Sequence, residues 1–205
     1  MSRRLVWLRH GQTAWNLARR VQGHTDIELD DAGHEQAAAA GSWVAGFGAS
    51  QLWSSDLARA RQTAAYVAKE SGLDVVGDER LREFDLGERS GIFLDDYQER
   101  FAEEYAAFQG GDFSVVPGAE TPEVVAVRLR GVAPEILAAL GQGETAVVVS
   151  HGTAIRTAVL ALTGMPLDLN QLRVLPNCGV AVLEQRADDP ALMRLVAYGL
   201  RAPNA

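Results

Sequence analysis

The stretch RLVWLRHG, residues 4–11, decides the fold of this 205-residue chain. The apolar run at positions 5–8 is typical of a strand that is buried on both faces of a sheet. This strand ends by presenting Arg9 and His10 together, and Gly11 lets the backbone come close to a ligand. A guanidinium beside an imidazole suits covalent phosphoryl transfer, because the first binds phosphate oxygens and the second is a nucleophile.

A second stretch, AVVVSHG at residues 146–152, repeats the pattern of an apolar strand followed by His-Gly. Ligands of open α/β sheets bind outside the carboxyl ends of the strands. If both strands run parallel in one sheet, His10 and His151 meet at that edge. The two triplets together therefore predict one site that holds two histidines.

Strands and helices alternate along most of the chain, which predicts an α/β fold: a three-layer α/β/α sandwich with a mostly parallel central sheet. We expect one domain over residues 1–205, with a loop and helix insertion at about 84–121 that caps the active site, and a disordered tail at 202–205. The expected strands are 4–8, 51–53, 73–76, 145–149, 179–184 and 192–198. The expected helices are 13–20, 31–44, 57–70, 95–108, 121–140 and 153–163, with a loop at 78–92.

Composition excludes several classes of protein. Hydrophobic residues make up 47% of the chain and charged residues 22%, as in ordinary globular proteins. The net charge of −8 argues against nucleic-acid and anionic-membrane binding, and no apolar stretch approaches the length of a membrane span. One cysteine, Cys178, excludes an internal disulfide and a cysteine-rich metal site. We therefore expect a cytoplasmic enzyme, and no metal site or cofactor.

Six segments, in order, resemble the histidine phosphatase superfamily, in the branch that is similar to cofactor-dependent phosphoglycerate mutases. The resemblance covers about residues 4–184. The matching segments are 8–13 (LRHGQT, with Trp15-Asn16 after it), 22–33 (from Gln22-Gly23 through DIELDDAG), 54–64 (SSDLARARQTA), 81–83 (LRE), 117–121 (PGAET) and 150–152 (SHG).

The resemblance implies that His10 is the nucleophile and forms a phosphohistidine. It also implies that Arg9 and Arg59 hold the phosphoryl oxygens, with planar donors that a lysine does not reproduce. Taken alone, Arg59 has a simpler interpretation. It follows Asp56 by three residues near a helix start, so the two side chains could form a surface ion pair.

His151 is expected to donate a hydrogen bond to the charged phosphoryl oxygens, a role that a protonated imidazole fills well. Glu83 is expected to be the general acid: it protonates the leaving oxygen and later activates water on the phosphohistidine. Asp85 and Glu88 in the same acidic loop are its rivals.

Further positions are expected around the phosphate. Asn16 and Gly23 are implied as secondary phosphate contacts, and Gln22 and His24 as parts of the pocket rim. Arg89 stands where the family often has tryptophan, in Gly87-Glu88-Arg89-Ser90-Gly91, and is a candidate for binding an acidic group of the substrate.

The resemblance implies a metal-independent phosphomonoester hydrolase for a small phosphorylated metabolite, such as a sugar phosphate or a phosphoglycerate derivative. Two alternatives stay open: a phosphoglycerate mutase-type isomerase, and a catalytically silent binding module. Residues 92–116 are short, acidic and aromatic where the mutases carry longer, arginine-rich insertions, which favours hydrolysis. Several members of the branch are dimers, so a homodimer is left open.

Overall fold

Six strands form one sheet in residues 2–203, the part of the chain that the computed structural model describes. They are β1 (Arg4–Arg9), β2 (Gln51–Ser54), β3 (Val75–Gly77), β4 (Thr145–Ser150), β5 (Val180–Gln185) and β6 (Met193–Leu200), in the spatial order β3-β2-β4-β1-β5-β6. The first four are parallel to one another, and β5 is antiparallel to both β1 and β6. The predicted α/β fold with a mostly parallel sheet is confirmed.

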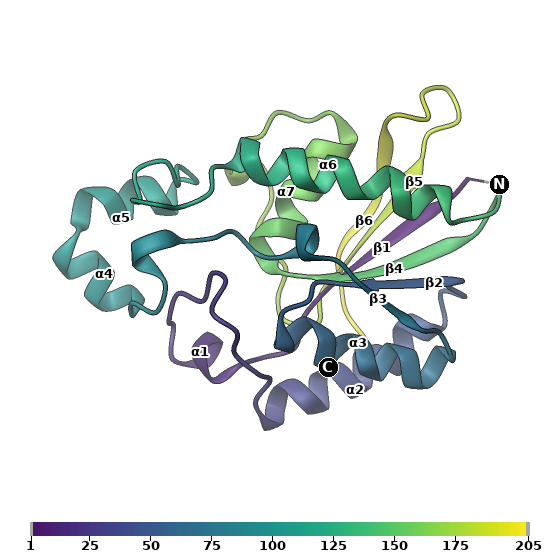
Figure 1. The fold of residues 1–205 in the computed structure, drawn as a ribbon, viewed down its shortest axis with the longest axis horizontal. Coiled ribbons are helices and arrows are strands. Elements are labelled where there is room, and N and C mark those ends of the chain that lie inside the picture. Colours follow the sequence, from purple (N-terminus) through teal and green to yellow (C-terminus); the bar gives the residue numbers. More distant parts are fainter. Residues whose placement is uncertain (1, 204–205) are drawn as a thin grey trace.

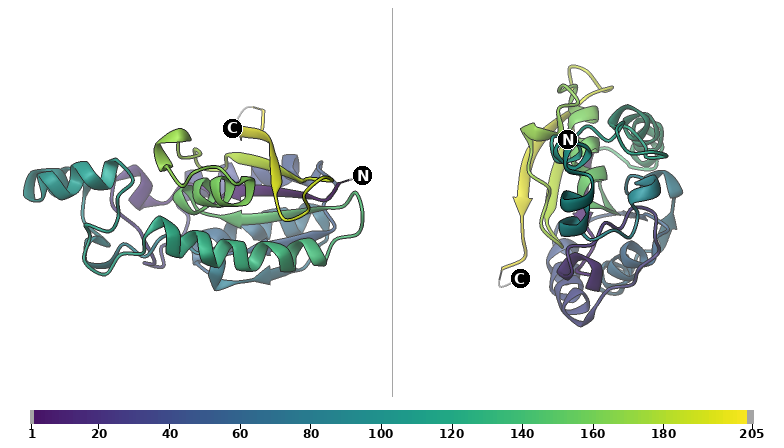
Figure 2. Two further views of the ribbon diagram at one scale, coloured as in Figure 1. Left: turned by 90° about the horizontal axis from the view of Figure 1, so that it is seen from above. Right: turned by 90° about the vertical axis from the view of Figure 1, so that its left-hand side faces the viewer.

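Helices cover both faces of the sheet (Figures 1 and 2). One face packs against α2 (Asp31–Ala45) and α3 (Ala58–Ser71), and the other against α6 (Pro122–Ala138) and α7 (Gly152–Thr163). The short helices α1 (Ala14–Leu17), α4 (Leu94–Arg100) and α5 (Ala102–Gln109) lie beyond the carboxyl ends of the parallel strands. Three 3-10 turns complete the description: Glu79–Leu81, Gly87–Arg89 and Leu169–Gln171.

Successive side chains of β1 point to opposite faces of the sheet, and both faces are buried. Leu5 and Trp7 belong to the core with α6 and α7, whereas Val6 and Leu8 belong to the core with α2 and α3. All four side chains are fully buried. Because neither face meets water, the strand reads as a continuous apolar run.

The helix predicted at 95–108 is instead two helices, because the chain leaves the helical region at Phe101 (φ −139°, ψ 52°). The break folds α5 back, so that Tyr105 and Phe108 pack on the buried Tyr97, with ring centroids 5.3 and 5.4 Å apart. Burial of this aromatic cluster outweighs the helix-forming tendency of the sequence.

The helix predicted at 13–20 is also shorter. Thr13 caps it as expected, but it ends at Leu17, and Arg19 takes a left-handed conformation (φ 53°). At the other end of the chain Ala202 is buried, so the expected disordered tail does not begin there; residues 204 and 205 lie outside the described residues. Among residues 2–203, no helix combines the length and the apolar character that a membrane span requires.

Candidate active site

Parallel pairing of β1 with β4 brings the two predicted histidines together. Arg9 is in register with Ser150, so each strand delivers the next residue to the same edge of the sheet. The ring centroids of His10 and His151 are 5.2 Å apart.

His10 is held as a neutral imidazole. It is 3% exposed, and its Nδ1 lies 2.7 Å from the carbonyl oxygen of Gly11. A carbonyl only accepts, so Nδ1 carries the proton and Nε2 keeps its lone pair. Burial, and then the charges of Arg59 and Arg9, lower the pKa of His10 well below its usual value. The group is therefore ready to act as a nucleophile at neutral pH.

Arg59, at the start of α3, is fixed deep in the site and is 1% exposed. Its terminal nitrogens donate to the carbonyl oxygens of Thr25 and Gly23, each at 2.8 Å. Burial lowers the pKa of Arg59 to about 10, so the guanidinium stays charged. The surface ion pair with Asp56 is not formed, because that carboxylate binds Arg82 instead.

Arg9 places a second guanidinium beside His10. Its Nη1 donates to the carbonyl oxygen of Leu175. Its Nε is buried and has no partner in residues 2–203. Gly152 makes room for this side chain, since a Cβ there would lie 3.2 Å from Nε. A buried cation with an unused donor is a binding group for an anion.

His151 differs from the expectation. Its Nδ1 accepts from Nε of Arg59 at 3.2 Å, and its Nε2–H donates to the hydroxyl of Ser55 at 2.8 Å. Burial, Arg59 and His10 lower the pKa of His151 well below its usual value. The unliganded site therefore favours neutral His151, whereas we expected the protonated form.

Glu83 reaches the site from the segment between β3 and α4, just after the 3-10 turn Glu79–Leu81. Its carboxylate accepts from the backbone N–H groups of Thr153 and Ala154 in the first turn of α7, at 3.0 and 2.8 Å. The two rivals lie elsewhere: Asp85 faces His24 at 3.8 Å, and the side chain of Glu88 is 70% exposed. Of the three carboxylates, Glu83 alone lines the pocket that holds His10.

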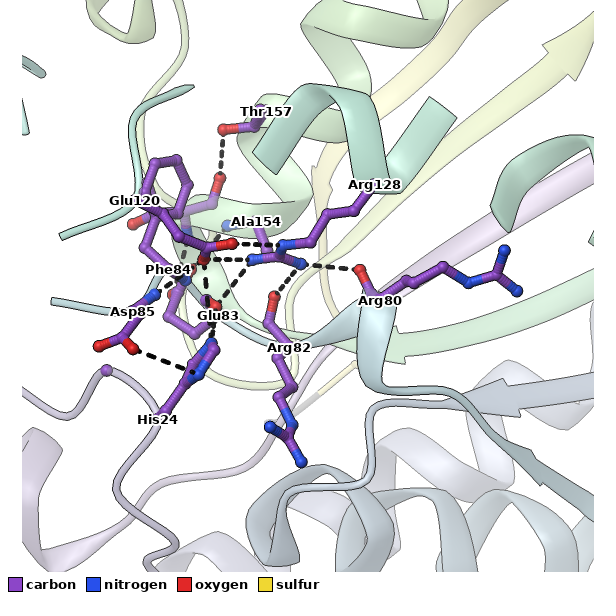
Figure 3. Close-up of polar contacts among 12 residues, drawn as sticks. His24, Arg80, Arg82, Glu83, Phe84, Asp85, Glu120, Arg128, Ala154 and Thr157 are labelled. Atoms are coloured by element: carbon purple, nitrogen blue, oxygen red, sulfur yellow. Dashed lines mark hydrogen bonds and ion pairs between the residues drawn. The ribbon is translucent and has the colours of Figure 1, made fainter. Parts of the chain in front are cut away.

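An ion pair between Arg128 and Glu120, outside the pocket, fixes the segment that carries Glu83 (Figure 3). Arg128 of α6 donates to three carbonyl oxygens of this segment, those of Arg80, Arg82 and Glu83, at 2.7 to 2.8 Å. Arg128 also binds both carboxylate oxygens of Glu120, at 3.1 and 3.0 Å, and Glu120 accepts from the backbone N–H of Asp85. We call Arg128 and Glu120 the clamp.

His24 belongs to this assembly rather than to the pocket rim. Its Nε2–H donates to the carbonyl oxygen of Glu83 at 2.8 Å, and Figure 3 shows the ring between Asp85 and Glu120. Asn16, Gln22 and Gly23 do line the pocket. The side-chain oxygen of Asn16 accepts from Thr13, which leaves its amide N–H groups for a ligand.

The pocket over His10 has a volume of about 290 Å³ and brings the expected site residues together. Arg9, His10, Asn16, Gln22, Gly23, Arg59 and Glu83 line it, and His151 contacts Arg59 directly behind it. Arg89 does not line it. Its guanidinium binds Glu104 at 2.7 Å and stacks on Phe101 at 3.9 Å, so it is not available to the substrate. Residues 2–203 contain no group of His, Cys, Asp and Glu side chains placed to hold a metal ion.

Several supporting residues were not identified from the sequence. Ser55 and Glu120 fall inside matched segments, and that was the only signal for them. No feature of the sequence pointed to Arg128 or Asn177 as supporting residues. The amide of Asn177 donates to the carbonyl oxygens of His10 and Gly11 at 3.0 and 3.1 Å, across 167 and 166 positions of the sequence.

Comparison with known proteins agrees with this geometry. A family model described as "Histidine phosphatase superfamily (branch 1)" matches residues 5–197. The probable phosphoglycerate mutase GpmB of Erwinia tasmaniensis is 33% identical over 180 residues, which are 87% of this chain and 83% of that protein.

Solved structures are similar over almost the whole chain. A mycobacterial glucosyl-3-phosphoglycerate phosphatase in complex with VO3 is 32% identical, with a TM-score of 0.90 over 96% of this chain and 98% of that one. A phosphoserine phosphatase mutant from Entamoeba histolytica, in complex with phosphoserine, is 25% identical, with a TM-score of 0.79 over 96% of each chain.

Proposed function

The chain belongs to the histidine phosphatase superfamily, and we propose that this enzyme is a metal-independent phosphomonoester hydrolase that works through a phosphohistidine at His10. One observation carries the proposal. His10 is neutral, its Nδ1–H is bonded to Gly11, and the remaining lone pair, on Nε2, belongs to a ring that lines a pocket with two arginines. A nucleophile that attacks phosphorus needs such a free lone pair, next to cations that bind the phosphoryl oxygens.

In the first step the guanidinium groups of Arg9 and Arg59 bind the phosphoryl oxygens. Nε2 of His10 attacks phosphorus as the bond from phosphorus to the ester oxygen breaks. Glu83 gives its proton to the departing oxygen, so the alcohol leaves neutral. Negative charge on the phosphoryl group favours the protonated form of a neighbouring imidazole, so His151 takes up a proton from solvent on Nδ1 when substrate binds. Nε–H of Arg59 then leaves Nδ1 and donates to a phosphoryl oxygen, and Nδ1–H of His151 donates to the phosphoryl group.

In the second step a water molecule attacks the phosphohistidine. The Glu83 carboxylate takes a proton from this water, and the bond from phosphorus to Nε2 breaks. Phosphate is released, and both His10 and Glu83 return to their starting states. Asn16, Gln22 and Gly23 are proposed as secondary phosphate contacts, supported by their positions on the pocket wall.

We further propose that residues 1–205 form one domain, in which the segment at about 84–121 caps the active site. Support comes from Leu94, Phe108 and Phe113, which belong to that segment and line the pocket. The single cysteine, buried at Cys178, supports a cytoplasmic location.

A mutase is the second candidate, because the sequence relatives include a probable phosphoglycerate mutase that is 33% identical. In that reaction the phosphohistidine passes its phosphoryl group to a hydroxyl rather than to water. Turnover of a phosphoglycerate only after priming with a bisphosphorylated phosphoglycerate, without net phosphate release, would favour the mutase.

The proposal is tested by phosphate release from a panel of phosphomonoesters in the presence of EDTA. We expect the wild type to hydrolyse at least one ester and His10→Ala to lose the activity by a factor of about 1,000 or more. Activity that EDTA abolishes, or that His10→Ala retains, would contradict the proposed mechanism.

A further inference from the structure

The pocket has two chemically different halves. Its inner half is polar and holds Arg9, His10, Asn16, Arg59 and Glu83. Its outer half, where the alcohol part of an ester would lie, is mostly apolar and aromatic, and Arg19, Arg20, Gln22 and Gln109 are its polar members. The apolar residues of this outer half are Trp15, Val21, Phe84, Leu86, Leu94, Phe108 and Phe113.

The aromatic wall is packed before any ligand binds. Phe113 lies 4.8 Å from Phe84 and 4.9 Å from Phe108, between ring centroids, and Phe108 also packs on Tyr97. Phe84 and Phe113 are 1% and 4% exposed, whereas Phe108 is only partly buried. Phe108 therefore offers the aromatic face that a ligand can cover.

The outer half also contains two arginines, and of these Arg20 has no carboxylate partner among residues 2–203. Arg20 stacks on Trp15 at 4.1 Å and donates to the carbonyl oxygen of Gly91. Arg19 pairs with Asp95 at 3.6 Å on the surface. Arg20 is thus held by its aromatic stack and one carbonyl oxygen, and the wall beside it stays mostly apolar.

The enclosed part of the pocket is small, and its mouth opens to solvent. Its volume of about 290 Å³ includes the space for the phosphate. Pockets for drug-sized ligands span roughly 300 to 1,000 Å³, so this one is at the small end. A phosphate and one ring, or a short branched chain, are what such a volume accommodates.

From these observations we infer that the substrates are phosphomonoesters of small apolar alcohols, and that Phe108 selects them by packing on a ring or branched chain. This inference rests on the proposed hydrolase function. It differs from our expectation of a sugar phosphate or phosphoglycerate derivative, because the accessible aromatic face of Phe108 favours an apolar group over the hydroxyl or carboxylate groups that those alcohols carry.

The test compares kcat/KM for 2-phenylethyl phosphate, glycerol 1-phosphate and 3-phosphoglycerate. All are primary alkyl esters, so the leaving groups are similar and the comparison reports on the pocket. Burial of one ring predicts a preference for 2-phenylethyl phosphate over glycerol 1-phosphate of about 10- to 100-fold. Phe108→Ala should reduce that preference ratio about tenfold, because the packing partner is lost.

Phe47→Ala is the matched control, since Phe47 is also partly buried but packs on Trp43 of α2, away from the pocket; it should leave the ratio unchanged. Faster hydrolysis of glycerol 1-phosphate or 3-phosphoglycerate would overturn the inference while leaving the hydrolase function intact. A ratio that Phe108→Ala does not reduce would overturn the assignment to Phe108. Failure to hydrolyse any of the esters in this series or in the wider panel would count instead against the proposed function.

Discussion

The two histidines of the site carry their protons on different ring nitrogens. His10 donates from Nδ1 to Gly11, whereas Nδ1 of His151 accepts from Arg59 and its proton lies on Nε2, toward Ser55. The same residue type can therefore serve two purposes. His10 is fixed with a free lone pair, and Nδ1 of His151 is fixed as the acceptor for the N–H of Arg59.

Burial of both neutral rings makes stability depend on pH. In the folded protein the pKa values of His10 and His151 lie well below 6.5, their usual value, because of burial first and the nearby arginines second. Below about pH 6.5 the unfolded chain therefore binds more protons than the folded one. The stabilisation is fully present above that pH and is lost as the pH falls.

We predict that the free energy of unfolding decreases below pH 6.5 by up to about 1.4 kcal/mol per pH unit for each of the two histidines. Urea denaturation between pH 7.5 and 5 measures this slope. The variant with both His10→Gln and His151→Gln should have a shallower slope. His34→Gln, which changes a histidine on α2 outside the site, is the control. An equal slope in the wild type and the double variant would show that the two rings do not stay neutral.

Glu83→Gln tests the general acid through the leaving group. Without a proton donor, phosphoryl transfer from an alkyl ester should slow about 100- to 10,000-fold. Transfer from 4-nitrophenyl phosphate should change little, since nitrophenolate leaves without a proton. This variant should therefore give a rapid burst of nitrophenolate and then slow turnover, because Glu83 also activates water.

Stopped-flow absorbance would record that burst. Glu88→Gln provides the control, since this carboxylate in the same loop is 70% exposed and does not line the pocket. Equal losses in the first step for both esters would assign the proton transfer to another group.

At the scale of elements, α6 holds the catalytic loop although none of its residues lines the pocket. Arg128 donates to the carbonyl oxygens of Arg80, Arg82 and Glu83 in this segment, and Glu120 accepts from the backbone N–H of Asp85. The carboxylate of Glu83 is fixed from the other side by the first turn of α7. Two helices on the same face of the sheet thus define where Glu83, the proposed general acid, lies.

Arg128→Met removes these carbonyl contacts and leaves Glu120 without its partner. We predict that kcat falls about 10- to 100-fold, because Glu83 is no longer held in one position. The inhibition constant for inorganic phosphate should change less than about threefold, since Arg9 and Arg59 keep their own contacts. Arg130→Met is the control on the same helix, where the side chain donates to Ala161 instead. An unchanged kcat, or a loss confined to phosphate affinity, would contradict a positioning role.

Elements with a strong pattern could be predicted from the sequence, and those shaped by tertiary packing could not. The runs at 5–8 and 146–149 lie in buried parallel strands as predicted. The helix predicted at 95–108 breaks at Phe101 because Tyr97 and Phe108 must pack on each other, and no local signal reports such a contact. Helix propensity is a weak guide where tertiary burial decides.

At the scale of the whole molecule, the topology makes the site. The order β3-β2-β4-β1-β5-β6 places β1 beside β4 (Figure 1), although about 140 residues separate them. Each of the two strands is followed directly by a histidine, so both histidines lie at one edge of the sheet. The two apolar runs that each end in His-Gly, in a sheet predicted to be mostly parallel, were sufficient to predict that the histidines meet, but not the strand order. The sequence could not predict which side chains a loop residue contacts. Arg89, which was expected to bind substrate, instead binds Glu104 and stacks on Phe101.

The central claim, that His10 carries the phosphoryl group during turnover, is tested most directly by trapping it. Glu83→Gln protein would be mixed with 4-nitrophenyl phosphate, quenched in alkali to preserve phosphohistidine, and mapped by peptide mass spectrometry. We predict one phosphate on His10, formed as fast as the nitrophenolate burst and absent in the His10→Ala background. Phosphate on another residue, or a burst without any phosphorylated peptide, would contradict the account.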